Sequence, residues 1–145
     1  MIEQPYSHIC LAVTDVDRAM DDLGPSMGLT WATPNEREMA EGRVRYTYSK
    51  EGPPRIELFQ GPPGSPWAAP NGSYMHHVGY WSDDMDGDKA RLVAAGMRVA
   101  VDGRETGRYF IYFESDHGLR VELTDVSRRQ TLEAWIAGAP PHGNR

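Results

Sequence analysis

The segment RIELFQ (residues 55–60) returns later in the chain as RVELTD (residues 120–125). Aliphatic residues alternate with polar ones in both segments, which predicts a β-strand in each. Each strand also places a glutamate, Glu57 or Glu122, on the face opposite its aliphatic residues. A carboxylate at the same point of two similar strands suggests that the two strands share an origin and a purpose.

A second pair of similar segments precedes the first pair. HICLAVTDVD begins at His8 and HVGYWSDDMD begins at His77, and each reaches an acidic pair after seven residues. The offset between the histidines is 77 − 8 = 69, and the offset between the glutamates is 122 − 57 = 65. Two matches in the same order at nearly the same offset indicate an internal duplication.

Each copy predicts a strand, a helix and then three strands. The helix of the first copy follows Asp15 and is expected to be interrupted at Gly24-Pro25, and that of the second copy spans 84–95 and ends at Gly96. A last helix is expected over 128–137, after a capping box of Ser127 and Gln130. The expected strands are 6–13, 29–33, 43–50 and 54–60 in the first copy, and 75–81, 97–101, 108–114 and 119–124 in the second.

The composition limits the classes of protein that this chain can belong to. Its 145 residues and 39% hydrophobic content suit one compact domain, and the net charge of −6 argues against sequence-independent nucleic-acid binding. Cys10 is the only cysteine, which excludes a disulfide within the chain. The sequence shows neither a signal peptide nor a membrane span, so we expect a cytoplasmic protein without a membrane partner.

The alternation of side chains gives each of the four strands one apolar face and one face that holds a histidine or a glutamate. For any single residue, the simplest interpretation is a two-faced sheet whose polar side meets water. The set of two histidines and two glutamates favours a different interpretation. If the two copies pair around a pseudo-twofold axis, His8, Glu57, His77 and Glu122 meet, and imidazole with carboxylate suits a divalent ion such as Ni, Co, Zn, Mn or Fe.

With these motifs the chain resembles the vicinal oxygen chelate superfamily, which includes glyoxalase I, methylmalonyl-CoA epimerase, extradiol dioxygenases and the bleomycin- and fosfomycin-resistance proteins. The resemblance rests on HICLAVTDVDRA, RIELFQ, HHVGYWSDDMD and GLRVELTD, and covers about residues 5–125. It implies an α+β fold of two βαβββ modules in tandem, with a mixed sheet curled around a central cleft, usually in a homodimer. We expect one domain over 1–138, with module one at 1–62, a linker at 63–73, module two at 74–125, a C-terminal helix at 126–138 and a tail at 139–145.

The resemblance also carries specific roles onto this sequence. It places His8, Glu57, His77 and Glu122 at the metal-ligand positions, with His76 as a competitor for His77 and His117 as a structural turn residue. The partner would be a small-molecule substrate or ligand. Candidate residues for contacting it are Arg55, Tyr46, Tyr48, Trp67, Trp81 and Arg108.

The function expected from the full ligand set is that of a metal-dependent isomerase or lyase. Such an enzyme abstracts a proton next to a metal-bound carbonyl, with Glu57 or Glu122 as the base. The alternative is a binding protein of the bleomycin-resistance type that sequesters an aromatic, cationic compound, which the negative charge and the Trp and Tyr content would suit. A dioxygenase ranks third, because a fourth protein ligand would crowd an iron site that needs open positions.

Overall fold

The computed structural model describes residues 2–141 of the chain, which form one mixed sheet and three α-helices. The elements of the first half are β1 (Tyr6–Ala12), α1 (Val16–Met27), β2 (Asn35–Met39), β3 (Gly42–Tyr48) and β4 (Arg55–Gln60). Those of the second half are β5 (Tyr74–Ser82), α2 (Met85–Ala94), β6 (Arg98–Asp102), β7 (Phe110–Glu114), β8 (Arg120–Asp125) and α3 (Arg129–Ile136). The last part of the predicted tail, 142–145, lies outside the described residues.

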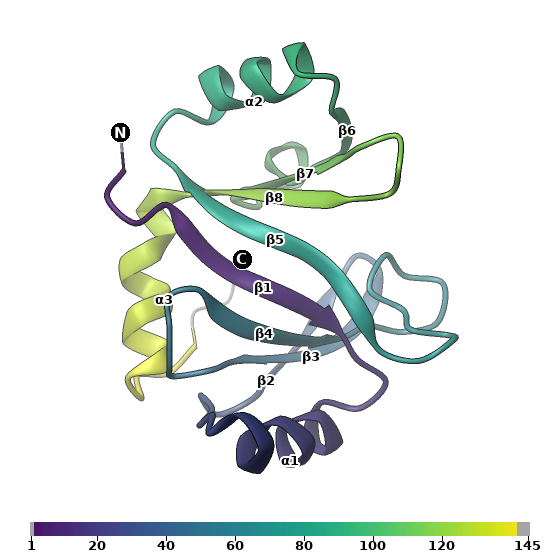
Figure 1. Cartoon of the computed structure of the whole chain (residues 1–145), viewed down its shortest axis with the longest axis vertical. Coiled ribbons are helices and arrows are strands. Elements are labelled where there is room, and N and C mark those ends of the chain that lie inside the picture. The colour runs from purple at the N-terminus through teal and green to yellow at the C-terminus, as the bar shows by residue number, and fades with distance from the viewer. Residues whose placement is uncertain (1, 142–145) are drawn as a thin grey trace.

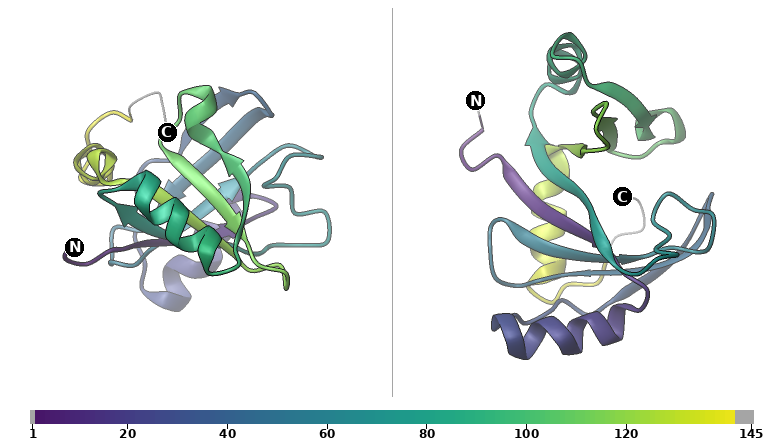
Figure 2. Two further views of the ribbon diagram at one scale, coloured as in Figure 1. Left: turned by 90° about the horizontal axis from the view of Figure 1, so that it is seen from above. Right: turned by 45° about the vertical axis from the view of Figure 1, so that its right-hand side comes forward.

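The eight strands form one sheet in the order β2-β3-β4-β1-β5-β8-β7-β6. At its centre β1 and β5 run antiparallel, while β1 pairs with β4 and β5 pairs with β8 in parallel. The sheet curls, α1 and α2 lie at opposite ends of the molecule, and α3 crosses beside both halves (Figures 1 and 2). This arrangement confirms the predicted α+β class with a curled mixed sheet.

The strand register repeats between the halves as the duplication requires. Cys10 lies opposite Glu57 in the β1–β4 pair, and Gly79 lies opposite Glu122 in the β5–β8 pair. These positions differ by 79 − 10 = 69 and 122 − 57 = 65, which are the two offsets of the sequence repeat. Across the central pair, His8 faces Gly79 and Cys10 faces His77. The offset of 69 relates His8 to His77 and Cys10 to Gly79, so each of these facing pairs is the counterpart of the other. The sequence repeat therefore corresponds to a pseudo-twofold relation of the two halves.

Two local predictions in the first half are wrong. Helix α1 runs through Pro25 and ends only at Gly28, which takes a left-handed φ of 67° and bonds back to the Gly24 carbonyl. Because Pro25 lies in the last turn, the helix loses one hydrogen bond there and still gains a favourable C-cap. The strand expected at 29–33 is reduced to a bridge between Trp31 and Ser49, and the true strand is β2. Strand β2 escaped prediction because its sequence, NEREM, has no apolar alternation, as suits a strand at the edge of the sheet.

The start of α3 also differs from the prediction. No side chain caps the helix at Arg128, so Ser127 and Gln130 form no capping box there. The preceding 3₁₀ turn, Val126–Arg128, is capped instead by Asp125, whose carboxylate accepts the Ser127 N–H at 2.9 Å. A carboxylate satisfies the free N–H groups at the start of a turn as well as a hydroxyl does.

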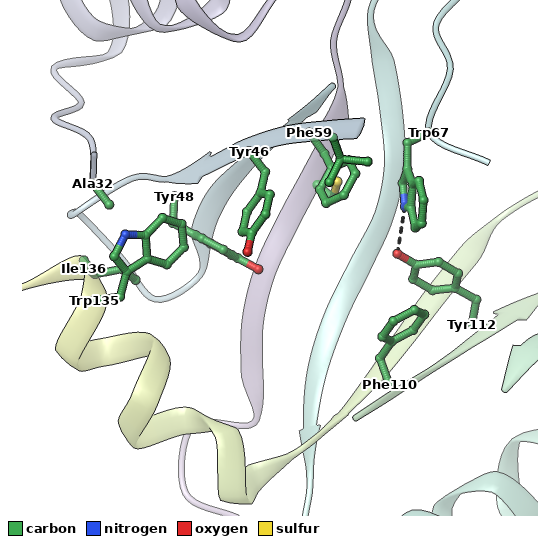
Figure 3. Close-up of a cluster of buried hydrophobic side chains, with 11 residues drawn as sticks. Ala32, Tyr46, Tyr48, Phe59, Trp67, Phe110, Tyr112, Trp135 and Ile136 are labelled. Carbon is green, nitrogen blue, oxygen red and sulfur yellow. Dashed lines mark hydrogen bonds between the residues drawn. The ribbon is translucent and has the colours of Figure 1, made fainter. Parts of the chain in front are cut away.

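An aromatic cluster fills the concave side of the sheet and joins both halves (Figure 3). The segment between β4 and β5, predicted as a linker, contributes Trp67, whose Nε1 donates to the Tyr112 hydroxyl at 3.0 Å. Helix α3 contributes Trp135 and Ile136, which are 6% and 5% exposed within their own chain. Among residues 2–141, no helix has the length and apolarity needed to cross a lipid bilayer.

Candidate metal centre

The two central strands and their parallel neighbours bring four polar side chains to one point. His8 comes from β1, Glu57 from β4, His77 from β5 and Glu122 from β8, and their exposed fractions are 2%, 0%, 1% and 0%. The face that holds them therefore does not meet water, which rules out the interpretation of a wetted polar side. Burial of two carboxylates is costly unless a cation compensates them.

The distances within this group suit a single cation between the four side chains. The two Nε2 atoms of His8 and His77 lie 2.9 Å apart. The Nε2 of His8 is 3.5 Å from Glu57 and 3.3 Å from Glu122, and the Nε2 of His77 is 3.8 Å and 3.5 Å from the same carboxylates. Ligands about 2.1 Å from one ion are separated by about 3.0 to 3.4 Å, so the distances of 2.9 and 3.3 Å match such a site and those of 3.5 to 3.8 Å lie slightly beyond it.

The tightest part of the group is formed by three residues. Donor atoms of His8, His77 and Glu122 all lie within 4.8 Å of one another. Two imidazoles and one carboxylate also form the iron site of many dioxygenases. Glu57 adds a fourth donor to this set from β4, in the half of the molecule opposite to Glu122.

The seat of His8 depends on a glycine of the opposite half. Its ring lies over Gly79, where a Cβ atom would come within 2.4 Å of Cε1 and 2.7 Å of both ring nitrogens. The Nδ1 of His8 also shares a hydrogen bond of 2.8 Å with the Ser7 hydroxyl. Gly79 leaves room for the imidazole of His8, and the hydrogen bond to Ser7 orients the ring within that space.

His77 is hydrogen-bonded to His76, the residue that was predicted to compete with it as a metal ligand. The two Nδ1 atoms of His76 and His77 lie 2.8 Å apart, and the Nε2 of His76 lies 2.9 Å from the Pro66 carbonyl. Both ring nitrogens of His76 are therefore occupied, one by His77 and the other by the Pro66 carbonyl. Burial, helped by the nearby charge of Arg120, lowers the pKa of His76 to about 4, so its ring is neutral at pH 7. Cys10 lies beside this pair, and its sulfur joins them in a second group of possible ligand atoms.

A cavity of about 70 Å³ opens beside His8. Three of the predicted substrate contacts, Tyr46, Tyr48 and Trp81, line it. The other lining residues were not anticipated, because most lie on α3 and on loops whose position the strand pattern does not determine. They are Ser7, Tyr109, Thr124, Arg128, Thr131, Leu132, Trp135 and Pro141.

The remaining predicted contacts lie outside the lining of this cavity. Arg55 forms an ion pair of 2.6 Å with Glu133 of α3, and Trp67 is in the aromatic core. Arg108 forms an ion pair of 3.0 Å with Glu41, which links the segment before β7 to the β2–β3 turn. His117 is exposed in the turn before β8, where its backbone N–H donates to Ser115. A role for Arg55, Trp67 or Arg108 in substrate binding stays a prediction.

This combination of fold and buried site defines a class of protein, and comparison with known families agrees with it. Residues 7–113 match the model of the glyoxalase/bleomycin resistance protein/dioxygenase superfamily, and the chain belongs to that superfamily. A search of curated proteins gives no match to the sequence.

Several solved structures share the fold at low sequence identity. Methylmalonyl-CoA epimerase from Mycobacterium tuberculosis has a TM-score of 0.65 and 16% identity, covering 86% of this chain and 92% of its own. The Streptomyces coelicolor epimerase, solved as a variant with 2-nitronate-propionyl-CoA, has a TM-score of 0.63 and 20% identity, covering 83% and 96%. A hypothetical protein from Bacillus halodurans C-125 reaches a TM-score of 0.69 at 18% identity, covering 83% and 92%.

Proposed function

We propose that this protein is a metal-dependent isomerase or lyase of the epimerase and glyoxalase type, which moves a proton at a carbon next to a carbonyl. The observation that carries the proposal is the pair of fully buried carboxylates, Glu57 and Glu122, which approach the same two imidazoles from opposite halves of the chain. The fold is shared with methylmalonyl-CoA epimerases at 16–20% identity, and an isomerase is compatible with it.

The four side chains would hold one divalent ion per chain. Bound there, such an ion would polarise a substrate carbonyl and stabilise negative charge on its oxygen. The residues of the chain perform the proton transfer. One glutamate accepts the proton as the C–H bond breaks and its electron pair moves toward the carbonyl oxygen, and a proton then returns to carbon from the same or the opposite glutamate.

An aromatic cavity adjoins the site. Tyr48, Trp81 and Trp135 line it next to His8. Thr124, which also lines the cavity, donates a hydrogen bond to Glu122 at 2.8 Å and so connects that carboxylate to the cavity wall.

The test is proton exchange in deuterated water. The metal-loaded protein is incubated with α-hydroxy ketones, 2-oxo thioesters and hemithioacetals, and deuterium uptake is followed by NMR. Removing the metal should abolish uptake. Glu57→Gln or Glu122→Gln should lower the rate by about 100-fold or more for the acting base, whereas Glu105→Gln, an exposed carboxylate remote from the site, should leave it unchanged.

The measurement of bound metal accompanies each rate, so that loss of the ion is separated from loss of the base. If the two glutamine variants keep their metal and both exchange at the rate of the unmodified protein, the proposed mechanism is wrong.

A sequestering protein is the second candidate, favoured by the aromatic lining of the cavity. Arg128 also lines it, stacked 4.7 Å from the Tyr109 ring centroid, so the site would suit a neutral or anionic aromatic compound better than the cationic one first expected. Tryptophan quenching that is equal with and without metal, with the ligand recovered unchanged, would favour this function. A dioxygenase ranks lower, because Glu57 supplies a fourth donor to the three-residue group.

Two further proposals concern organisation. We infer a single domain over 1–138 built from the two modules, with the C-terminal helix packed onto both. A homodimer of this domain is expected from the family, in which dimers are common, although Trp135 and Ile136 are used within the chain. The dimer surface must therefore lie elsewhere.

A further inference from the structure

A line of hydrogen bonds runs from a backbone carbonyl to the proposed metal centre through two consecutive histidines. The carbonyl oxygen of Pro66 lies 2.9 Å from Nε2 of His76. The Nδ1 of His76 lies 2.8 Å from Nδ1 of His77, and the Nε2 of His77 faces His8 at 2.9 Å. All three histidines are buried, with exposed fractions of 3% or less. The contacts are therefore shielded from competition by water.

The carbonyl gives this line a direction. A carbonyl oxygen only accepts, so the hydrogen in the first contact belongs to Nε2 of His76. In its neutral form this imidazole carries a single N–H, which the Pro66 contact places on Nε2. Its Nδ1 must then accept the hydrogen from Nδ1 of His77. A neutral imidazole has one N–H, so the Nε2 of His77 presents a lone pair to the centre.

We propose that His76 is a positioning residue that fixes the tautomer of His77, so that its Nε2 lone pair is directed at the metal before the metal arrives. This inference rests on the metal site proposed above. It also explains why two adjacent histidines occur in the second module and only one in the first. One histidine would bind the ion, and the other would hold the binding ring in the required state.

The equivalent position in the first module supports this assignment. Ser7 and His76 are related by the repeat offset, 76 − 7 = 69, and each contacts Nδ1 of the histidine that follows it. Without a metal, the Nε2 lone pair of His77 accepts from Nε2 of His8, and Ser7, whose hydroxyl can donate or accept, allows the hydrogen of His8 to move to Nδ1. The two modules thus use the same position for two purposes. The tautomer of His77 is fixed before the ion binds, whereas the tautomer of His8 changes when the ion binds.

The experiment compares three substitutions that differ in what they return to His77. His76→Asn places an amide oxygen near the position of Nδ1, and so restores an acceptor for His77. His76→Gln carries its polar atoms near the position of Nε2 and restores the contact to Pro66 alone. His76→Leu removes both contacts at similar volume.

Affinity for Co²⁺ is measured by competition with a chromophoric chelator, and thermal unfolding shows that each variant is folded. We expect the His76→Gln and His76→Leu variants to bind Co²⁺ about 10- to 100-fold more weakly, and the His76→Asn variant to stay within about threefold of the unmodified protein. If His76→Leu does not fold, the comparison of the Asn and Gln variants decides the question. Equal affinity in the Asn and Gln variants would overturn the proposal.

A second measurement needs neither metal nor substrate. Long-range ¹H–¹⁵N spectra of the metal-free protein report which ring nitrogen of His77 carries its hydrogen. The expected result is a protonated Nδ1 in the unmodified protein and a mixture of tautomers in His76→Gln. Finding the hydrogen on Nε2 of His77 in the unmodified protein would disprove the assignment. Absence of Co²⁺ binding with the expected tautomer would instead count against the metal site.

Discussion

Replacement of Gly79 by alanine tests the seat of His8 directly. Gly79 adopts an ordinary strand conformation, so the substitution adds volume without straining the backbone. The new Cβ would lie 2.4 Å from Cε1 of His8, whereas two carbon atoms in contact need about 3.5 Å. The imidazole or the strand beneath it must therefore move by about 1 Å.

Both stability and metal affinity should respond to this shift. Added volume in a packed interior costs about 1–3 kcal/mol. The ring cannot move by that amount and keep its contacts of 2.8 Å to Ser7 and 2.9 Å to His77. Loss of a residue that supports a metal ligand lowers metal affinity by about 10- to 100-fold. Displacement of the ligand itself should cost at least as much, so we expect the affinity for Co²⁺ to fall by about 10- to 100-fold or more.

The assay combines urea denaturation with Co²⁺ titration against a competing chelator. Gly24→Ala is the matched control, because its Cβ would make ordinary contacts of 3.4 and 3.6 Å and it lies in α1, away from the centre. In that helix alanine should be neutral or stabilising. An unchanged Co²⁺ affinity in Gly79→Ala would show that His8 is not a ligand, or that its ring does not lie over Gly79.

Three further measurements follow from the structure. Chelation should lower the melting temperature, because an ion at 100 times its Kd stabilises the folded state by about 2.7 kcal/mol; an unchanged melting temperature on chelation would argue against the site. Hydrogen bonds from Arg104 and then Lys89 hold the pKa of Asp102 well below its ordinary 3.8, so Asp102→Asn should cost about 1–3 kcal/mol at pH 7. That difference should shrink as the pH falls below 3.8, since the unfolded chain then takes up a proton that the folded chain resists; a difference that persists at lower pH would contradict this assignment. Light scattering at micromolar concentration should show a dimer, and a single species of 16.2 kDa would exclude it.

Much of the candidate site could be proposed from the sequence because duplication and alternation are local properties of a sequence. The offsets of 69 and 65 identified His8, His77, Glu57 and Glu122, and the period of two placed each of them opposite an aliphatic face. The same reasoning gave a strand, a helix and three strands in each copy, and the family resemblance carried by these motifs implied the α+β class. These features need no knowledge of what lies across the sheet.

The rest depends on contacts between segments far apart in the sequence. Alternation assigns a side chain to a face, but only the curl of the sheet and the packing of α3 and Trp67 decide that this face is dry. The space above Gly79 exists because His8 crosses from another strand, and the state of His77 depends on a carbonyl eleven residues earlier, at Pro66. Continuation of α1 through Pro25 likewise depended on a C-cap at Gly28. The sequence by itself determined which groups are present and which face of the sheet they share. The tertiary structure decided their distances, burial and hydrogen-bonding state. Burial and long-range hydrogen bonds arise only when distant segments of the chain pack together.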